Sequence, residues 1–346
     1  MKTQSDMKTV TFGMTDLEVA PIAFGTWQLG GDWGQFDEQE GIAAIRHARE
    51  LGINLFDTAQ GYGFGASERL LGRALRDDLD HRRDEVVIAT KGGLRMTGDG
   101  VVRDSSPAWL RRGVEESLRA LEADHVDIYQ VHWPDPSVPF AETAGALQEL
   151  VEEGKIRHVG VSNFDASQID EFARTRPVET LQPPYHVFRR EIEDELLPYA
   201  GEHDIGVLVY GPLAHGLLTG SLNEQTEFAA DDWRSGAPFF KGEHYRRNLH
   251  TARELQRFAS EELGGSVSQL AIAWTLAHPA VQVSIVGARS AGHIEEAVAA
   301  AQLRLSEADL ERIARIMGGS VPIAGPFPEM GRLTSETSVF TETNVS

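Results

Sequence analysis

The feature that most constrains the fold of this chain is a regular alternation of short apolar runs with longer amphipathic stretches. Eight of the runs are short and rich in β-branched residues, as expected for strands that are buried on both faces. Strands that alternate with helical stretches form parallel βαβ units, and eight such units predict a closed (β/α)8 TIM barrel. The runs cover residues 22–24, 53–57, 86–90, 126–132, 156–162, 180–182, 206–210 and 281–286.

Most of the segments between these runs show signals of a helix. Ser106 is a suitable N-cap for a helix that has Pro107 at its first position. Gly154 follows another helical pattern at the place where glycine commonly ends a helix. The helical patterns cover residues 38–51, 107–121, 140–153, 165–174, 191–203, 266–277 and 291–301.

Several segments fall outside this repeat. Residues 9–12 and 17–19 flank a turn and predict a hairpin before the first barrel strand. Residues 211–245 form a long connection with Gly and Pro, and connections of this length are usually functional or disordered. Residues 306–316 predict an extra helix that begins close to a capping box, and residues 317–346 are a polar tail. We expect a single domain over residues 1–346, with its core at about residues 9–316.

Composition excludes several classes of function. The chain has 346 residues and a formal net charge of −21, which opposes binding to nucleic acid and to anionic membrane surfaces. It has no cysteine, which excludes disulfides, thiolate catalysis and Cys-ligated zinc. We find neither a signal peptide nor a run of about 18 apolar residues and expect a cytoplasmic protein. The sequence leaves the oligomeric state open.

Chemically active side chains follow three successive predicted strands. Asp57 and Tyr62 lie at the end of the second strand, Lys91 at the end of the third and His132 at the end of the fourth. The active sites of (β/α)8 barrels lie at the carboxyl ends of the strands, so these four side chains are expected to share one mouth.

These four residue types fit proton transfer to a carbonyl oxygen. A tyrosine has a reference pKa of about 10, and a neighbouring Lys91 cation would favour the phenolate and lower that pKa. Asp57 would hold the ammonium group in place, and a neutral His132 would direct a substrate carbonyl oxygen. None of the four supplies a hydride, so the site requires a cofactor.

The same four residues match, residue by residue, the catalytic tetrad of the aldo-keto reductases, and the chain resembles this family over about residues 9–316. The likeness is strongest to the bacterial branch that includes the general stress and inositol-associated reductases. It implies an oxidoreductase that reduces an aldehyde or a ketone, or runs in reverse, with Tyr62 as the proton donor. The flanking motifs are Gly25-Thr26-Trp27, Asp57-Thr58-Ala59-x-x-Tyr62-Gly63, Gly160-Val161-Ser162-Asn163-Phe164, Gln182-x-x-Tyr185, Tyr210-Gly211-Pro212-Leu213, Gly216-Leu217-Leu218-Thr219-Gly220 and Val286-Gly287-Ala288-Arg289.

The resemblance also implies which residues bind a nicotinamide cofactor. Ser162, Asn163 and Gln182 would bind the nicotinamide carboxamide, and Tyr210 would stack on the ring. Residues 211–220 would follow the pyrophosphate, and residues 287–290 would meet the adenosine 2′-phosphate at a helix N-terminus. The residues implied at the cofactor are Gly25, Thr26, Trp27, Asp57, Ser162, Asn163, Gln182, Tyr210, Gly211, Pro212, Leu213, His215, Gly216, Leu218, Gly287, Ala288, Arg289, His293 and Glu296.

The 2′-phosphate region departs from the family pattern. The family often has Lys, Arg and Asn where this chain has Gly287, His293 and Ala297. Arg289 retains a guanidinium suited to phosphate. We therefore expect NADP(H) to be favoured, with NAD(H) as the other cofactor. His215 stands where members of the branch can carry an arginine directed at the pyrophosphate.

Alternative interpretations concern the mouth loops and the overall function. Trp27, Trp33, Phe64 and Trp133 would line a pocket for a small-molecule substrate, or they would only pack the loops.

The chain has no His-x-His motif, so we expect no metal site and regard a metal-dependent hydrolase as remote. A cofactor-binding sensor or regulatory subunit on the same fold is the other hypothesis, although such a protein would not need the intact tetrad.

Overall fold

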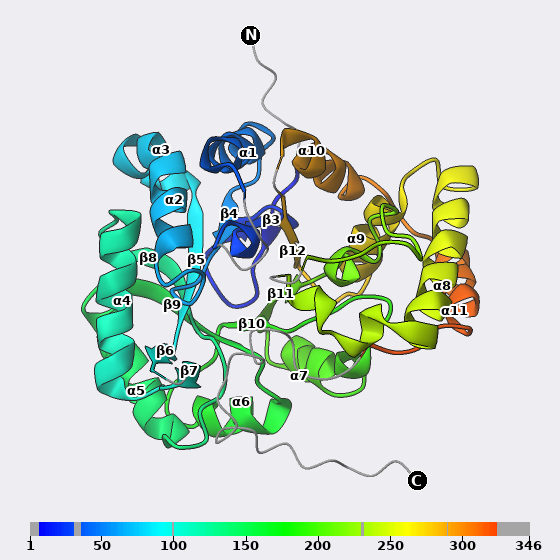
Figure 1. Cartoon of the computed structure of the whole chain (residues 1–346). Coiled ribbons are helices and arrows are strands. Elements are labelled where there is room, and N and C mark those ends of the chain that lie inside the picture. Colours follow the sequence, from blue (N-terminus) through cyan, green and yellow to red (C-terminus); the bar gives the residue numbers. More distant parts are fainter. Residues whose placement is uncertain (1–6, 31–35, 99, 230–231, 289, 324–346) are drawn as a thin grey trace.

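The computed structural model describes residues 7–30, 36–98, 100–229, 232–288 and 290–323. Eight parallel strands close into a barrel in which each strand pairs with the next one along the chain, and β12 pairs with β3 (Figure 1). This confirms the predicted (β/α)8 fold. The barrel strands are β3 (Ile22–Gly25), β4 (Leu55–Asp57), β5 (Val87–Gly92), β8 (Val126–Val131), β9 (Ile156–Ser162), β10 (Thr180–Gln182), β11 (Gly206–Tyr210) and β12 (Val283–Gly287).

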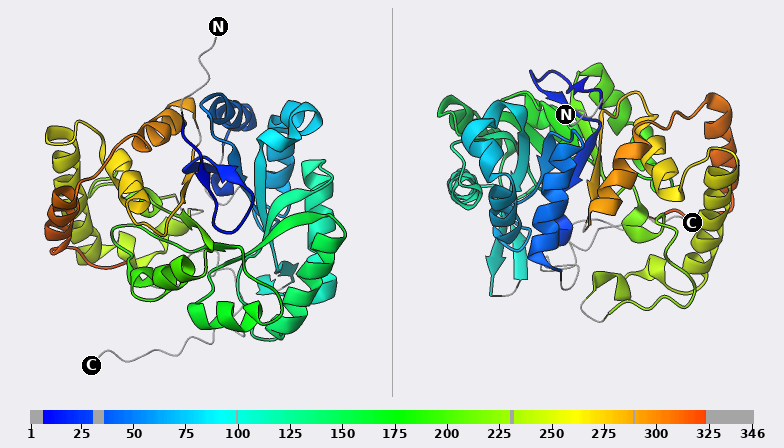
Figure 2. Two further views of the ribbon diagram at one scale, coloured as in Figure 1. Left: turned by 180° about the vertical axis from the view of Figure 1, so that it is seen from behind. Right: turned by 90° about the horizontal axis from the view of Figure 1, so that it is seen from above.

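Helices surround the barrel (Figures 1 and 2). The predicted cap positions Ser106 and Gly154 lie at the expected helix ends, although the Ser106 side chain makes no capping hydrogen bond. Asp165, Ser266 and Ser306 begin helices with reciprocal capping boxes. The helices are α1 (Glu38–Glu50), α2 (Ala66–Ala74), α3 (Arg76–His81), α4 (Pro107–Leu121), α5 (Phe140–Glu152), α6 (Ala166–Ala173), α7 (Leu196–Glu202), α8 (Gly242–Glu261), α9 (Val267–Leu276), α10 (Ala291–Ala300) and α11 (Glu307–Met317).

Alternate residues of the strands fill two separate cores. On β4, Leu55 points into the barrel while Phe56 packs against the surrounding helices. On β5, Val87 and Ala89 face inward and Ile88 faces outward. Because both faces of β4 and β5 carry buried apolar side chains, these strands appear as apolar runs in the sequence.

The predicted hairpin is confirmed as the antiparallel pair β1 (Val10–Thr11) and β2 (Glu18–Val19). Phe12, Leu17 and Val19 belong to the inner core of the barrel, so the hairpin closes the end of the barrel opposite to the carboxyl ends of the strands (Figure 2). Closure at this end leaves the other end of the barrel for the site.

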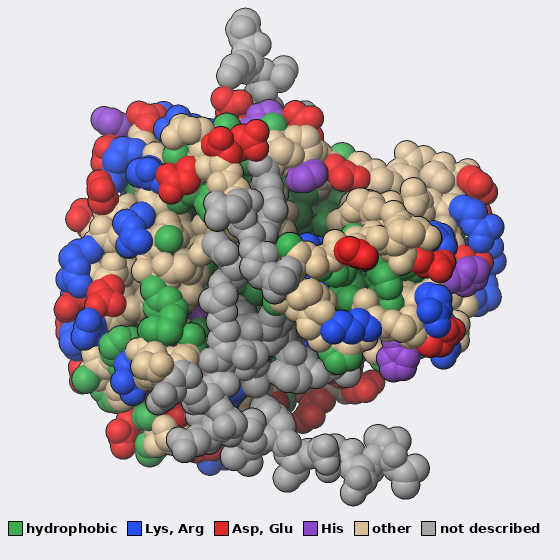
Figure 3. All heavy atoms as spheres, viewed as in Figure 1, with side chains coloured by type: hydrophobic (Ala, Val, Ile, Leu, Met, Phe, Trp, Pro, Cys, Tyr) green, Lys and Arg blue, Asp and Glu red, His purple; other side chains and the backbone are tan. Residues whose placement is uncertain are grey.

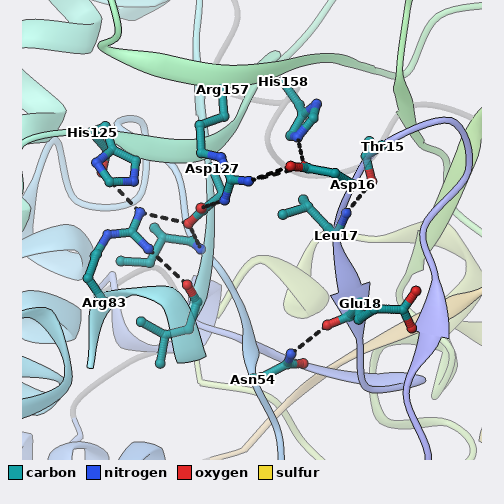
Figure 4. Close-up of polar contacts among 12 residues, drawn as sticks. Thr15, Asp16, Leu17, Glu18, Asn54, Arg83, His125, Asp127, Arg157 and His158 are labelled. Atoms are coloured by element: carbon teal, nitrogen blue, oxygen red, sulfur yellow. Dashed lines mark hydrogen bonds and ion pairs between the residues drawn. The ribbon is translucent and has the colours of Figure 1, made fainter.

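A charged network holds the hairpin turn on the barrel (Figure 4). Asp16 in the turn pairs with Arg157 at 3.0 Å and with His158 Nε2 at 2.8 Å, both on β9. Buried Asp127 on β8 accepts hydrogen bonds from Arg157 at 2.9 Å and from Arg83 at 2.7 Å. The network therefore links the turn to two barrel strands.

The prediction of one continuous helix over residues 191–203 was wrong. The segment divides into a 3-10 turn, η3 (Glu191–Glu193), and α7, with a non-helical Glu195 (φ −136°) between them. Pro198 explains the break, because its ring would clash with the carbonyl of Asp194 if one helix ran through the segment.

The long connection after β11 contains several short helices. It contains the short helices η4 (Ala214–Gly216), η5 (Trp233–Ser235) and η6 (Pro238–Phe240), and α8 begins at Gly242, inside the predicted connection. We did not predict α8, although its buried residues Tyr245, Leu249, Ala252, Leu255 and Ala259 follow a helical spacing. The helix packs beside α11 (Figure 2).

The described start of the predicted tail is held on the barrel. Val321 exchanges hydrogen bonds with Asn248 on α8, and the Ile323 amide donates to the Phe188 carbonyl at 2.8 Å. Ile323 is also buried. We also did not predict α2, α3 and the hairpin of β6 (Leu94–Thr97) and β7 (Gly100–Arg103).

Candidate active site

The carboxyl ends of β4, β5 and β8 bring the four predicted catalytic side chains together. Asp57 is the last residue of β4, Lys91 lies in β5, and His132 follows β8. Lys91 is fully buried, and its ammonium group donates to Asp57 Oδ1 at 2.7 Å, to the Thr58 carbonyl at 2.9 Å and to the Tyr62 hydroxyl at 3.1 Å. An ammonium group has three N–H donors, so these bonds satisfy all of them.

Tyr62 is presented by a tight loop between β4 and α2. Gly63, Phe64 and Gly65 all have positive φ, at 63°, 45° and 90°. Such a conformation is unfavourable for Phe64, and strained backbone of this kind concentrates at functional sites. Lys91 Nζ also lies 4.8 Å from the centre of the Tyr62 ring, so the cation faces both the hydroxyl and the π-system.

His132 completes the group on the other side of Tyr62. The two rings meet edge to face with their centres 5.7 Å apart, and His132 is 2% exposed. The His132 amide donates to the Gly92 carbonyl, and the His132 carbonyl accepts from Asn163 Nδ2 at 3.0 Å. The backbone on which His132 sits is thus fixed by neighbouring strand ends.

Polar side chains from β9, β10 and β11 continue the site. Gln182 Nε2 donates to Asp57 Oδ2 at 2.8 Å, and Ser162 Oγ donates to the Gln182 carbonyl at 2.9 Å. The Tyr210 hydroxyl donates to Asn163 Oδ1 at 2.9 Å. These bonds connect the four predicted catalytic residues to Ser162, Asn163 and Gln182, the residues implied at the nicotinamide carboxamide.

A cavity of about 500 Å³ opens at this end of the barrel. Asp57, Tyr62 and His132 line it, whereas Lys91 lies behind Asp57 and Tyr62. Trp27 stacks near Tyr62, with ring centres 6.3 Å apart, and also lines the cavity. The other lining residues that the sequence indicated are Gly25, Ser162, Asn163, Gln182, Tyr210, Gly211, Pro212, Leu213, His215, Gly216, Gly287, His293 and Glu296.

The turn at η4 forms one wall of this cavity and has an unusual backbone. Gly211, Ala214, His215 and Gly216 all have positive φ, at 70°, 46°, 55° and 102°. Successive turns of this kind direct backbone N–H groups into concavities that bind anions. Arg234 also lines the cavity, and its guanidinium donates to the His215 carbonyl at 3.2 Å.

His215 is not a cation in this wall. Its ring packs edge to face on Trp233 with centres 5.0 Å apart, and burial lowers the pKa of the imidazole to about 3, helped by the charges of Arg189 and Arg234. The cation of this wall is therefore Arg234, which pairs with Asp232 at 2.6 Å, and not the histidine.

The opposite end of the cavity lies at the start of α10. His293 is in the first turn of that helix, and Glu296 follows one turn later. Glu296 Oε1 accepts a 2.5 Å hydrogen bond from the Ser266 hydroxyl, which also caps α9. The bond fixes the position of this carboxylate on the cavity wall.

The sequence over residues 21–317 matches the model of the aldo/keto reductase family. The chain belongs to this family. The aldo-keto reductase YhdN of Bacillus subtilis is 42% identical over 84% of the chain and 87% of its own length. The NADH-specific methylglyoxal reductase of Escherichia coli is 35% identical over 88% of the chain and 96% of its own length. The solved structure of the glycerol dehydrogenase AKR11B4 from Gluconobacter oxydans superposes with a TM-score of 0.83 at 38% identity, covering 93% of this chain and 99% of that one.

Some residues indicated by the sequence lie away from the cavity of this aldo/keto reductase. Thr26, Leu218 and Ala288 are buried and do not line it. Phe64 and Trp133 pack with Leu94 and Val101 beside the mouth and also do not line it. Trp33 and Arg289 lie outside the described residues.

The cavity also has lining residues that we did not indicate from the sequence. Gln28 follows directly after the Gly25-Thr26-Trp27 motif, and Ile285 and Val286 lie near the end of the last strand. Ser268 and Ile272 are four residues apart on one face of α9, a spacing visible in the sequence. Arg234 has no such signal, because it comes from the long connection. The remaining ones are Ser221 and Leu222, whereas Thr219 and Ala297, which also line the cavity, belong to the regions that the sequence placed near the pyrophosphate and the 2′-phosphate.

Two further observations concern the described part of the chain. It contains no group of three or more His, Asp or Glu side chains arranged to bind a metal ion. None of its helices combines the length and the apolar character needed to span a bilayer.

Proposed function

We propose that this aldo/keto reductase is an NADP(H)-dependent reductase of aldehydes or ketones in which Tyr62 donates the proton. The observation that carries the proposal is the set of three hydrogen bonds made by the buried Lys91 ammonium to Asp57, Thr58 and Tyr62. The same groups would serve alcohol oxidation, in which Tyr62 accepts the proton.

The cavity has the features that a nicotinamide dinucleotide requires. Ser162, Asn163 and Gln182 offer hydrogen-bonding groups next to the catalytic residues, and Tyr210 offers an aromatic face. The positive-φ turn around His215 suits a pyrophosphate, and Arg234, which is paired with Asp232 at 2.6 Å, adds a guanidinium to the same wall. When it is bound, the nicotinamide supplies the hydride that the four residues lack.

The protein side chains then donate the proton and orient the carbonyl oxygen. The Tyr62 oxygen accepts a hydrogen bond from Lys91, and in the proposed reaction its O–H donates the proton to the carbonyl oxygen. Lys91 stabilises the phenolate that remains after proton transfer, and Asp57 keeps the ammonium in place. His132 lies edge-on to Tyr62 and orients the carbonyl oxygen between them.

The preference for NADP(H) over NAD(H) rests on the start of α10. Helix N-termini favour phosphate groups, and His293 lies in the first turn on the cavity wall. The negative charge of Glu296 disfavours a 2′-phosphate nearby, although its carboxylate accepts a hydrogen bond from the Ser266 hydroxyl. We therefore propose NADP(H) as the favoured cofactor and NAD(H) as a usable one.

The experiment that tests this function follows the absorbance of NADPH, and separately of NADH, with a panel of small aldehydes and ketones. We expect oxidation of both cofactors, faster at low concentration with NADPH. Tight cofactor binding without turnover in either direction, with carbonyls or with alcohols, would contradict the proposal and favour a sensor or regulatory subunit.

A further inference from the structure

The loop that presents Tyr62 is closed at its base by two buried hydroxyl groups. It begins directly after β4 at Thr58 and ends in the first turn of α2 at Ser67, and Thr58 Oγ1 lies 3.1 Å from Ser67 Oγ. Acidic and basic side chains are spread over the outer surface of the molecule (Figure 3), whereas these two side chains are completely buried. Bulk water therefore does not compete for their hydrogen bonds.

A third buried hydroxyl extends this contact into a chain that returns to β4. The Ser67 hydroxyl has one proton, and its nearest acceptor is Thr26 Oγ1 at 2.6 Å. Thr58 is then the donor to Ser67, and Thr26 donates to the Asp57 carbonyl at 3.1 Å. Each hydroxyl thus donates one hydrogen bond to the next acceptor, and hydrogen bonds linked in this way strengthen one another in a protein interior.

The hydroxyl chain holds the backbone that surrounds the Lys91 ammonium. The Thr58 carbonyl accepts from Lys91 Nζ at 2.9 Å, and the Ser67 amide donates to the Tyr62 carbonyl at 3.2 Å. Asp57 provides the carbonyl at the end of the chain and also the carboxylate that pairs with Lys91. A shift of Ser67 relative to Thr58 therefore changes the distance between the Tyr62 hydroxyl and Lys91 Nζ, which is 3.1 Å.

The same chain fixes an aromatic wall of the mouth. Thr26 lies directly before the 3-10 turn η1 (Trp27–Leu29), and the Trp27 ring stacks near Tyr62. Because Ser67 binds Thr26 through its hydroxyl and Tyr62 through its amide, it connects the two segments that carry these rings. Ser67 itself is buried and does not line the cavity.

We propose that Ser67 is a positioning residue for the proton transfer. Its hydroxyl closes the loop and holds the Tyr62 hydroxyl within hydrogen-bonding distance of Lys91. Without it, Thr58 loses its acceptor on α2 and Thr26 loses its donor, so the base of the loop opens. The kinetic consequence rests on the proposed function, whereas the closure of the loop does not.

Ser67→Ala tests the role, and Ser284→Ala is the matched control. Ser284 on β12 is equally buried, and its hydroxyl accepts from Thr275 at 3.1 Å, but it neither lines the cavity nor contacts the Tyr62 loop. Both variants should lose a similar amount of stability to urea. We expect kcat to fall about 10- to 100-fold in S67A and to stay within about twofold in S284A, because catalysis is sensitive to small displacements of the reacting groups. The Kd of NADPH, measured by tryptophan quenching, should be unchanged in both.

Thr58→Val opens the same contact from the other side. Valine replaces the hydroxyl with a methyl group of similar size, so this variant also serves if S67A does not fold. Its kcat should fall by a factor similar to that of S67A. The S67A/T58V double variant should lose no more than about twofold beyond the larger single loss, because both substitutions remove one shared hydrogen bond. Losses that multiply in full would show that the two hydroxyls act separately and would contradict the closure.

The pH dependence of kcat distinguishes positioning from a general loss of structure. A nearby cation favours the tyrosinate, so moving Tyr62 away from Lys91 should raise the pH at which the phenol ionises. The alkaline fall of kcat for carbonyl reduction should therefore lie at higher pH in S67A than in wild type, and at the same pH in S284A. An unmoved alkaline limb in S67A, or an equal loss of kcat in S67A and S284A, would overturn the proposal.

The same ionisation can be measured without turnover. The ultraviolet absorbance of tyrosinate is recorded for wild type and for S67A, and the signal of the same protein carrying Tyr62→Phe is subtracted from each. We expect a higher midpoint in S67A than in wild type. If wild type shows no turnover, the proposed function fails, and a shifted midpoint still supports the closure of the loop by Ser67. Equal midpoints reject the role of Ser67 whether or not the protein is active.

Discussion

Lys91 Nζ lies 2.7 Å from Asp57 Oδ1 at the barrel mouth, and both side chains are almost completely buried. Two charges removed from water are costly to the fold unless they pair closely and their remaining hydrogen bonds are satisfied. Here the ammonium has three acceptors, and the second carboxylate oxygen accepts from Gln182. The pair therefore holds a cation in a dry site, where it acts strongly on the neighbouring Tyr62.

Breaking this pair should destabilise the protein as well as the reaction. We expect Asp57→Asn to lower the free energy of unfolding by about 3–5 kcal/mol, because it leaves a buried ammonium without its counterion. The double variant Asp57→Asn/Lys91→Met should recover part of that stability but none of the activity. Urea denaturation and turnover measure the two effects. A single variant as stable as wild type would show that Lys91 is not charged in the fold.

The hydroxyl of Tyr62 should matter for chemistry and not for cofactor binding. Tyr62→Phe removes the proton donor, and general acid catalysis contributes about 10²–10⁴-fold. We expect kcat to fall by at least this factor while the Kd of NADPH, measured by tryptophan quenching, stays within about twofold. Full activity in the variant would contradict the assignment, and a lost cofactor affinity would show that the ring was structural.

The sequence was sufficient to predict that Asp57, Tyr62, Lys91 and His132 lie together, because the order of the strands around a closed barrel fixes where their ends lie. Once the strands that end near Asp57, Lys91 and His132 were recognised, their carboxyl ends had to meet at one mouth. The loop carrying Tyr62 also follows directly from its strand. These placements depend on local patterns and on the closure of the sheet, both of which are visible in the residues.

The features that escaped prediction are of two kinds, and the first depends on how the long connection folds. Arg234 reaches the cavity wall from this connection, where its guanidinium pairs with Asp232 at 2.6 Å and donates to the His215 carbonyl at 3.2 Å. The burial that neutralises His215 arises from Trp233 in the same connection. The break near Pro198 and the helical spacing of α8 were readable, since both follow from rules for single helices.

Cofactor selectivity should respond to His293 at the start of α10. His293→Arg places a permanent fork-shaped cation on the cavity wall, and a hydrogen bond between charged groups contributes about 1.5–3 kcal/mol. We expect the ratio of kcat/KM for NADPH to that for NADH to rise about 10- to 100-fold. His293→Gln, which has the polarity without the charge, is the control and should not raise the ratio. An equal gain with both cofactors would place residue 293 away from the 2′-phosphate.

Stability should depend on pH through His158 at the closed end of the barrel. Burial disfavours the imidazolium, but its hydrogen bonds to Glu179 at 2.7 Å and to Asp16 at 2.8 Å outweigh this effect and raise the pKa of His158 above 6.5. The bond from His158 in turn lowers the pKa of Asp16 below 3.8. A group whose pKa is higher in the folded protein stabilises the fold fully at pH values below its unfolded pKa. This stabilisation is lost as the pH rises through its folded pKa. The stabilisation of the fold by Asp16 is present at pH values above its unfolded pKa and is lost only as the pH falls through its lowered folded pKa.

The hairpin turn is therefore held best in mildly acidic solution, with both partners charged. We expect His158→Gln to lower the free energy of unfolding by roughly 1 kcal/mol more at about pH 5.5 than at about pH 9, measured by urea denaturation. His250→Gln is the control, because that histidine is exposed on α8 and should show the same small effect at both pH values. A His158→Gln penalty that is equal at the two pH values would mean that the ring contributes by packing alone, and one that grows toward high pH would reverse the sign of the linkage.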